Sequence, residues 1–309
     1  MNYKVKSKLD TINKILAVIL VITLIALVLV VSFYKGNDAQ GDQGSEGSGS
    51  TVAAIEEFKP GTYGGIEFKT PEDVAAYYVK CYNYTKTLTA EYTVDGKPQT
   101  MYKLLGGETL EIKNLLIEGK ANPALDKTVG SLAGSQFKSE AKGLPPNGGN
   151  SPENDKSPDG SIVYTDSAFS GEDIQNCNVK DNNDGTITIQ IQPKKSVNAK
   201  EKADSQGKFF NVLGDVPGIV DELGIVTFTT GSVTDNVIVD YEGGYGTIVI
   251  DTATGEIVKA DYLENIHISI THANAFGIVK DKSASLDIIY NTQAPASDQF
   301  FAERNIVKK

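Results

Sequence analysis

An uninterrupted apolar run from Ile15 to Phe33 constrains this chain more than any other feature. It contains no charged residue, and its polar members are Thr23 and Ser32. At about 1.5 Å per residue, a helix of this length approaches the roughly 30 Å hydrocarbon thickness of a bilayer. A soluble amphipathic helix would carry a polar face, which this run lacks. The sequence therefore predicts a transmembrane helix over residues 15–34, which contacts the membrane through residues 15–33.

The charges beside this run predict its orientation. Four lysines precede it and one follows it closely: Lys4, Lys6, Lys8, Lys14 and Lys35. By the positive-inside rule, residues 1–14 form a cytoplasmic tail and the rest lies outside the cell membrane. A cleaved signal peptide is the alternative, but residues 30–34 make a poor cleavage site. No cysteine lies near the end of the run, which argues against a lipid-modified lipoprotein.

The outer part is strongly acidic. From Gly36 onward there are 24 lysines and arginines (29 less the five lysines named above) against 39 acidic residues (40 less Asp10), a balance of −15. Such a charge argues against nucleic acid as a partner. Residues 35–54 are rich in Gly, Ser, Asp and Gln and predict a flexible linker. Residues 55–309 then form one extracytoplasmic α+β domain, with a mobile Pro/Gly/Asn-rich loop at 142–160.

Two cysteines occur, Cys81 and Cys177. Outside the membrane they are free to form a disulfide. The alternative is that both are small buried apolar residues. Their spacing matches no zinc or redox motif, so the sequence predicts neither a metal site nor a cofactor.

A helix is predicted to begin at Pro71. Thr70 fits the N-cap position, Pro71 the first helical position, and Glu72 and Asp73 follow where the helix dipole favours acidic side chains. Apolar residues then recur at helical spacing through Tyr78 and Cys81. Tyrosines on this face suit an aromatic ligand site, although such a face more often belongs to the core.

The remainder reads mostly as strands. Alternation predicts a hairpin over residues 88–105 and an antiparallel meander over the last 140 residues or so, of which the isoleucines at 187, 189 and 191 are typical. Turns are predicted at 181–185, 243–246 and 251–255. A short broken helix is expected over 211–223, and a second helix is considered over 125–137. The fold class is α+β, a helix packed on a twisted antiparallel sheet.

No motif supports catalysis. Asp181 to Gly185 resembles a calcium loop, but the required first and twelfth ligand positions hold Lys180 and Ile191. His267 and His272 are an odd number of residues apart, which on a regular strand points them to opposite faces. The sequence therefore predicts a protein that is not an enzyme.

The predicted order of elements, with Asp251 to Ile257 between two long strands, resembles uncharacterised membrane-anchored extracytoplasmic proteins of Gram-positive bacteria. The resemblance covers Thr70 to Tyr290. The architecture is also similar to the superfamily of lipoprotein-localisation factors and mycobacterial envelope lipoproteins. That likeness implies helices covering a curved sheet, with room for lipid between them, although this chain lacks their lipid-attachment cysteine. The families offer no catalytic motif, and fold analogy alone does not give function.

Three functions remain open. The first is a non-catalytic envelope module that binds an unknown envelope protein or has a structural role. The second is a carrier of an apolar or lipid-like ligand between helix and sheet, and the third, least supported, is a cell-envelope hydrolase. One helix of about 10 Å diameter does not cover a sheet of roughly 25 Å, so a second helix or a ligand must cover the remainder. The predicted lining residues are Tyr78, Val239, Tyr241, Ile248, Ile250, Tyr262, Ile266, Ile268, Leu286 and Ile288.

Overall fold

The computed structural model describes residues 55–121, 139–157, 159–224, 226–275 and 279–309, together with Pro123 and Lys127. The predicted tail, transmembrane helix and linker lie outside these ranges, as does nearly all of the predicted helix at 125–137. Within the described ranges, no helix has the length and apolar composition needed to cross a bilayer.

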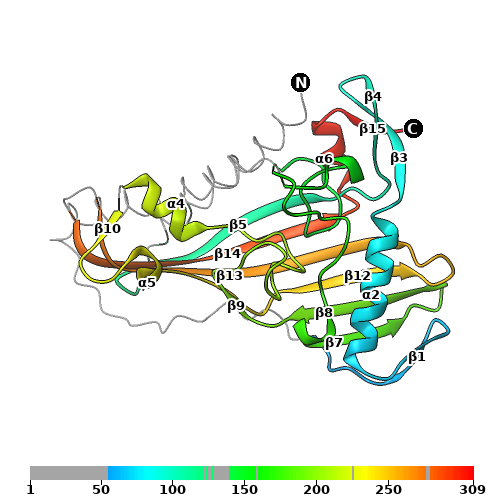
Figure 1. The fold of residues 1–309 in the computed structure, drawn as a ribbon, viewed down its shortest axis with the longest axis horizontal. Coiled ribbons are helices and arrows are strands. Elements are labelled where there is room, and N and C mark those ends of the chain that lie inside the picture. Colours follow the sequence, from blue (N-terminus) through cyan, green and yellow to red (C-terminus); the bar gives the residue numbers. More distant parts are fainter. Residues whose placement is uncertain are drawn as a thin grey trace.

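A large antiparallel sheet dominates the described residues, which makes the fold α+β and rich in strands (Figure 1). Its main path runs β6-β5-β14-β13-β12-β8-β7, with β10 and β11 also paired to β13 and β9 to β11. Alternating buried and exposed residues along β8 place Ile187, Ile189 and Ile191 in the core, as predicted. The strands are β5 (Gly107–Ile117), β6 (Lys120–Ala121), β7 (Ile174–Asp181), β8 (Thr186–Pro193), β9 (Ser196–Val197), β10 (Val226–Phe228), β11 (Val237–Tyr241), β12 (Tyr245–Asp251), β13 (Ile257–Ala275) and β14 (Val279–Ala294).

The predicted turn at 243–246 is a bulge and not a reversal of the chain. Strands β11 and β12 both pair with β13, with Tyr241 opposite Ile266 and Tyr245 opposite Leu263. They therefore follow one another along the same side of β13, with an extra residue between them. The bulge shifts the buried positions from odd numbers in β11 to even numbers in β12. The sheet is consequently not the simple meander that the sequence predicts.

The other two predicted turns are confirmed as hairpins. Strands β7 and β8 are joined at 181–185, where Asp181 accepts hydrogen bonds from the N–H groups of Asn183 and Gly64, each at 2.8 Å. Strands β12 and β13 are joined at 251–255. There Gly255 has a φ of 77°, a conformation that glycine adopts without a Cβ clash.

Helix α2 (Pro71–Thr85) begins where the sequence predicts. The Asp73 carboxylate accepts the N–H of Thr70 at 3.0 Å, which satisfies a donor at the helix start. Val74, Tyr78 and Cys81 are buried against the end of the sheet formed by β7, β8 and β12 (Figure 1). The prediction of a helix packed on an antiparallel sheet is confirmed.

Smaller elements complete the described fold. Helices α4 (Val216–Leu223) and α5 (Val233–Asn236) lie at the opposite end of the sheet from α2 (Figure 1). The expected helix at 211–223 therefore begins only at Val216. A separate three-stranded sheet has the order β15-β3-β4, next to the short helix α6. These remaining elements are β1 (Gly61–Tyr63), β2 (Ile66–Phe68), β3 (Thr89–Val94), β4 (Lys97–Tyr102), the 3-10 turns η1 (Pro152–Asn154) and η2 (Gly171–Asp173), α6 (Asp298–Glu303) and β15 (Ile306–Lys308).

The packing of α2 on the sheet predicts a large effect of truncating Ile248, which is fully buried in the core beneath the helix. Ile248→Ala is expected to lower the free energy of unfolding by about 2–5 kcal/mol, because it leaves a cavity. Urea denaturation measures this change. The exposed Lys259→Ala on the neighbouring strand should stay within about 0.5 kcal/mol of the parent. Equal effects of the two substitutions would contradict the described core.

Candidate functional site

The burial of segment 139–157 is a feature of the fold that the sequence does not predict. It was predicted as part of a mobile loop at 142–160, but Lys142, Leu144, Asn147 and Asp155 are buried. Its backbone is bonded to the rest of the fold: the N–H of Gly106 donates to the carbonyl of Lys142 at 2.7 Å. Residues 142–157 of the predicted loop are therefore not an excursion away from the fold, because their backbone and charged groups find partners inside the protein, and the mobility of the loop stays a prediction.

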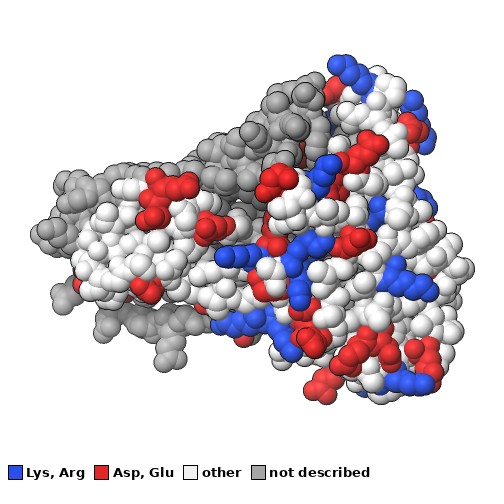
Figure 2. Space-filling view, viewed as in Figure 1, with Lys and Arg blue, Asp and Glu red and all other residues white. Residues whose placement is uncertain are grey.

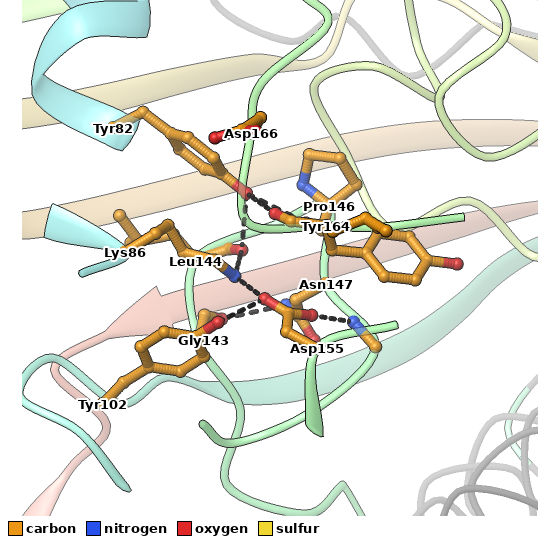
Figure 3. Close-up of polar contacts among 12 residues, drawn as sticks. Tyr82, Lys86, Tyr102, Gly143, Leu144, Pro146, Asn147, Asp155, Tyr164 and Asp166 are labelled. Carbon is orange, nitrogen blue, oxygen red and sulfur yellow. Dashed lines mark hydrogen bonds and ion pairs between the residues drawn. The ribbon is translucent and has the colours of Figure 1, made fainter. Parts of the chain in front are cut away.

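Asp155, near the end of this segment, forms a buried ion pair with Lys86 (Figure 3). Their side chains are 1% and 0% exposed. Lys86 directly follows the last turn of α2, and its backbone N–H donates to the Tyr82 carbonyl at 2.9 Å. Asp155 directly follows the 3-10 turn η1. The pair therefore joins the end of the helix to the 139–157 segment.

Each oxygen of the Asp155 carboxylate has a further donor. The Tyr102 hydroxyl donates to Oδ2 at 2.6 Å, and the backbone N–H of Gly148 donates to Oδ1 at 2.6 Å. The Lys86 ammonium lies 4.4 Å from the centre of the Tyr102 ring and donates to the Leu144 carbonyl at 3.4 Å. These contacts replace the water that both charges lose on burial.

Tyr82 closes the other side of the pair. Its hydroxyl oxygen lies 3.0 Å from the carbonyl oxygen of Pro146, 3.1 Å from that of Tyr164 and 3.3 Å from that of Leu144 (Figure 3). A phenol has one proton, so it donates to one of these carbonyls at a time. The hydroxyl thus fixes the turn at 144–146 against α2.

A second buried ion pair joins Lys142 to Glu108, with 3.5 Å between Nζ and Oε2. Asn211 links Glu108 to the segment: its Nδ2 donates to Glu108 at 2.7 Å, and its Oδ1 accepts the N–H of Asn147 at 3.0 Å. The Asn147 side chain in turn donates to the Gly143 carbonyl at 2.9 Å. The two ion pairs and these hydrogen bonds therefore hold the segment by a polar network in the protein interior.

Burial shifts the pKa values of Lys86 and Tyr82 toward their neutral forms. Loss of solvation lowers the pKa of Lys86, and the neighbouring Asp155 partly opposes that shift. Loss of solvation also raises the pKa of Tyr82 well above 10, with a further rise from the Asp155 charge. Tyr78, Tyr241 and Tyr262 are likewise buried, and their pKa values are raised for the same primary reason.

The residues predicted to line an apolar ligand site lie in two separate clusters. All ten are at most 2% exposed. Tyr78, Ile248, Ile250 and Tyr262 pack beneath α2, where the Tyr78 and Tyr262 hydroxyls are 3.2 Å apart. The other six pack at the end of the sheet near α4: Val239, Tyr241, Ile266, Ile268, Leu286 and Ile288. They therefore do not line one shared cleft.

The two cysteines are free and buried. Cys81 lies on α2 and Cys177 on β7, both in the apolar cluster beneath the helix. Burial raises the pKa of each thiol to about 11, so both stay protonated at neutral pH. Of the two interpretations of Cys81 and Cys177, a disulfide or two buried apolar residues, the second describes this structure.

The two histidines do not lie on opposite faces of a regular strand. A register shift between Ile270 and Ala273 changes the phase of β13, and both His267 and His272 are about half exposed. His267 Nδ1 lies 2.7 Å from Asp287, whereas His272 Nδ1 lies 2.8 Å from Asp281. They do not converge on one site. Across the described ranges, no three His, Cys, Asp or Glu side chains are grouped as a metal site.

A groove of about 290 Å³ lies beside the three-stranded sheet. Charged side chains of both signs line it, among them Asp95, Glu140, Glu303 and Arg304. Arg304 is fixed there because its Nε donates to the Ser139 carbonyl at 2.8 Å and its guanidinium lies 3.6 Å from the Phe300 ring centre. The groove therefore offers fixed polar groups at the surface, unlike the buried network.

The sequence does not predict that Lys86, Asp155, Glu108 and Lys142 are buried in ion pairs, nor does it predict the groove. A lysine after a helix and an aspartate in a Pro/Gly/Asn-rich run are both typical of exposed positions. Comparisons with protein-family models, with curated proteins and with solved structures found no match. The resemblance to Gram-positive envelope proteins stays a prediction.

The buried tyrosines predict a loss of stability at alkaline pH. Their pKa is raised in the folded protein, so their contribution is fully present below pH 10, the value for the unfolded chain, and is lost as the pH rises further. The lowered pKa of Lys86 makes the free energy of unfolding rise with pH, but this is the effect of one group, whereas four tyrosines make it fall. Above pH 10, the free energy of unfolding is expected to fall.

Tyrosinate absorbance and circular dichroism, recorded together, measure this behaviour. One set of tyrosines is expected to ionise only as the β-sheet signal disappears, while exposed tyrosines titrate earlier. The matched variant Tyr82→Phe should remove one tyrosine from the late set. Ionisation of every tyrosine with the sheet signal intact would contradict the burial described.

Proposed function

We propose that this chain is a single-pass, membrane-anchored protein of the cell envelope. Its extracytoplasmic body serves as a non-catalytic structural or protein-interaction module. Residues 15–33 anchor it, and the N-terminus is cytoplasmic. Support for the anchor comes from the apolar run and its flanking lysines. The resemblance to membrane-anchored extracytoplasmic proteins of Gram-positive bacteria agrees with this placement.

The non-catalytic role is supported by one observation: the charged side chains of the two buried ion pairs are almost inaccessible to solvent. A hydrolase needs acid, base or nucleophile groups that converge where a substrate can reach them. Here Lys86, Asp155, Lys142 and Glu108 are paired with one another at 5% exposure or less. These groups are used to hold the fold together, and a substrate does not reach them.

The apolar-ligand alternative and the hydrolase alternative have less support. For a ligand to lie between helix and sheet, it would have to displace rings that already pack together, such as Tyr78 and Phe209 with centres 5.4 Å apart. The ten predicted lining residues are part of two packed clusters. An interaction or structural role requires no such displacement.

The proposed contact with an envelope protein uses the groove beside the three-stranded sheet. It presents a positioned arginine next to several carboxylates, and strand β4 has four exposed residues at its start. In Figure 2, basic and acidic side chains are interspersed over the right and centre of the face, whereas only acidic side chains appear on the left, where α4 and α5 lie. Mixed charge of this kind suits a polar protein surface better than a polyanion.

The topology can be tested by labelling cysteines in intact cells that express the full chain. Cys81 and Cys177 are buried, so the unmodified chain provides a background without labelling. Gln299→Cys, at an exposed position of α6, is expected to react with a membrane-impermeant maleimide. Ser7→Cys is expected to react only after permeabilisation. Labelling of Ser7→Cys, but not of Gln299→Cys, on intact cells would reverse the orientation.

Site-specific photo-crosslinking tests the interaction. A photoreactive residue at Gln99, which lines the groove, is expected to give a discrete adduct with one envelope protein. The same residue at the exposed Lys180 on edge strand β7 should give none. Arg304→Ala should reduce the Gln99 adduct severalfold, because it removes the fixed charge. Identical adducts from both positions, unchanged by Arg304→Ala, would count against a specific partner at the groove.

A further inference from the structure

The contact between Lys86 and Asp155 places an amine against a carboxyl group in a site closed to bulk solvent. The two residues are far apart in the sequence, but the fold brings Nζ and Oδ2 into direct contact. Both side chains are essentially unexposed. In water, an amine and a carboxylic acid stay apart as solvated ions, whereas a fixed contact in a dry site brings them to reaction distance.

We propose that Lys86 and Asp155 condense to an intramolecular amide bond, which joins Nζ to Cγ and releases one water molecule. This is a covalent modification of the protein by its own side chains. It is independent of the envelope role proposed above.

The protein environment favours the reactive form of Lys86, whose side chain is 1% exposed. An unsolvated ammonium is costly, so burial favours loss of its proton to the contacting oxygen as the reaction proceeds. The lowered pKa of Lys86 agrees with this direction. A neutral amine has the free electron pair that attack on a carbonyl carbon requires.

The two oxygens of Asp155 are held for different roles. Oδ1 accepts the backbone N–H of Gly148 at 2.6 Å, which would stabilise negative charge on this oxygen as Nζ attacks Cγ. Oδ2 accepts the hydroxyl of Tyr102 at 2.6 Å and contacts Lys86, so it is the oxygen placed to leave. Tyr102 touches a reacting atom and is therefore assigned as a catalytic residue.

The reaction balances without any other reactant. The Nζ–Cγ bond forms and the Cγ–Oδ2 bond breaks. Of the three protons on the Lys86 ammonium, two leave with Oδ2 as water and the third stays on the amide nitrogen. Oδ1 becomes the amide carbonyl oxygen and keeps its hydrogen bond from Gly148. Nothing is oxidised or reduced.

Aromatic rings pack closely around the pair. The ammonium lies 4.4 Å from the centre of the Tyr102 ring and 5.7 Å from that of Tyr82 (Figure 3). At Gly143, even one added Cβ would lie 2.7 Å from the Tyr102 ring and 3.0 Å from Lys86 Nζ. Condensation releases water and hydrolysis of the amide consumes it. A site closed to solvent therefore favours the amide.

The test is the intact mass of the purified, denatured full chain. The wild-type protein is expected to be lighter than its calculated mass by one water molecule. Lys86→Arg keeps the charge and approximate length of the side chain, and it should show its full calculated mass apart from any processing shared with the wild type. A wild-type protein without the deficit relative to this control overturns the proposal, whether or not the variant folds.

Proteolysis followed by tandem mass spectrometry assigns the bond. A branched peptide joining the segments that contain Lys86 and Asp155 is expected. The Lys142–Glu108 pair is an internal comparison, since it is also buried but its charged atoms are 3.5 Å apart. A deficit that maps to that pair, or to any other, overturns the assignment.

Tyr102→Phe tests the chemistry separately from the fold. This variant keeps the ring beside Lys86 but loses the hydrogen bond to Oδ2. In pulse-labelled, newly synthesised chains, the cross-linked fraction is expected to rise at least tenfold more slowly than in the wild type. An unchanged rate would overturn the role assigned to Tyr102.

Discussion

The contact between Lys86 and Asp155 determines how the middle of the chain is arranged. A charge removed from water needs an opposite charge and hydrogen bonds, and these partners come from α2, from β4 and from the 139–157 segment. If one partner were missing, the others would have unsatisfied polar groups in the interior. The same contact that fixes the end of α2 therefore also fixes a polar segment that has almost no regular secondary structure.

Much of the large sheet was predictable from local pattern. Along β8, alternation between isoleucine and polar residues requires one buried face, and the start of α2 is encoded by Thr70, Pro71 and Asp73 within four positions. Such signals depend on neighbours in the sequence. The bulges near Gly243 and His272 were not predictable in this way, because an extra residue is inserted without any change in composition.

The candidate site could not be derived from the sequence because its partners are distant from one another along the chain. Asn211 connects to Glu108 and to Asn147, and neither contact has a local spacing to recognise. The segment 139–157 has the composition of a surface loop, since composition does not distinguish polar groups bonded to water from polar groups bonded to protein. The groove depends in the same way on the pairing of the C-terminal β15 with β3, far earlier in the chain.

The position of β14 between β5 and β13 has a consequence for how the protein is made. Gly107 of β5 pairs with Gln293 of β14, so an early strand obtains its neighbour only when the end of the chain is available. During synthesis from the N-terminus, the facing edges of β5 and β13 stay open until then. Such distant pairing slows folding and exposes strand edges to aggregation. The main sheet is thus completed only once β14 is available, and a chain truncated before Val279 would keep two unpaired edges in place of the centre of its sheet.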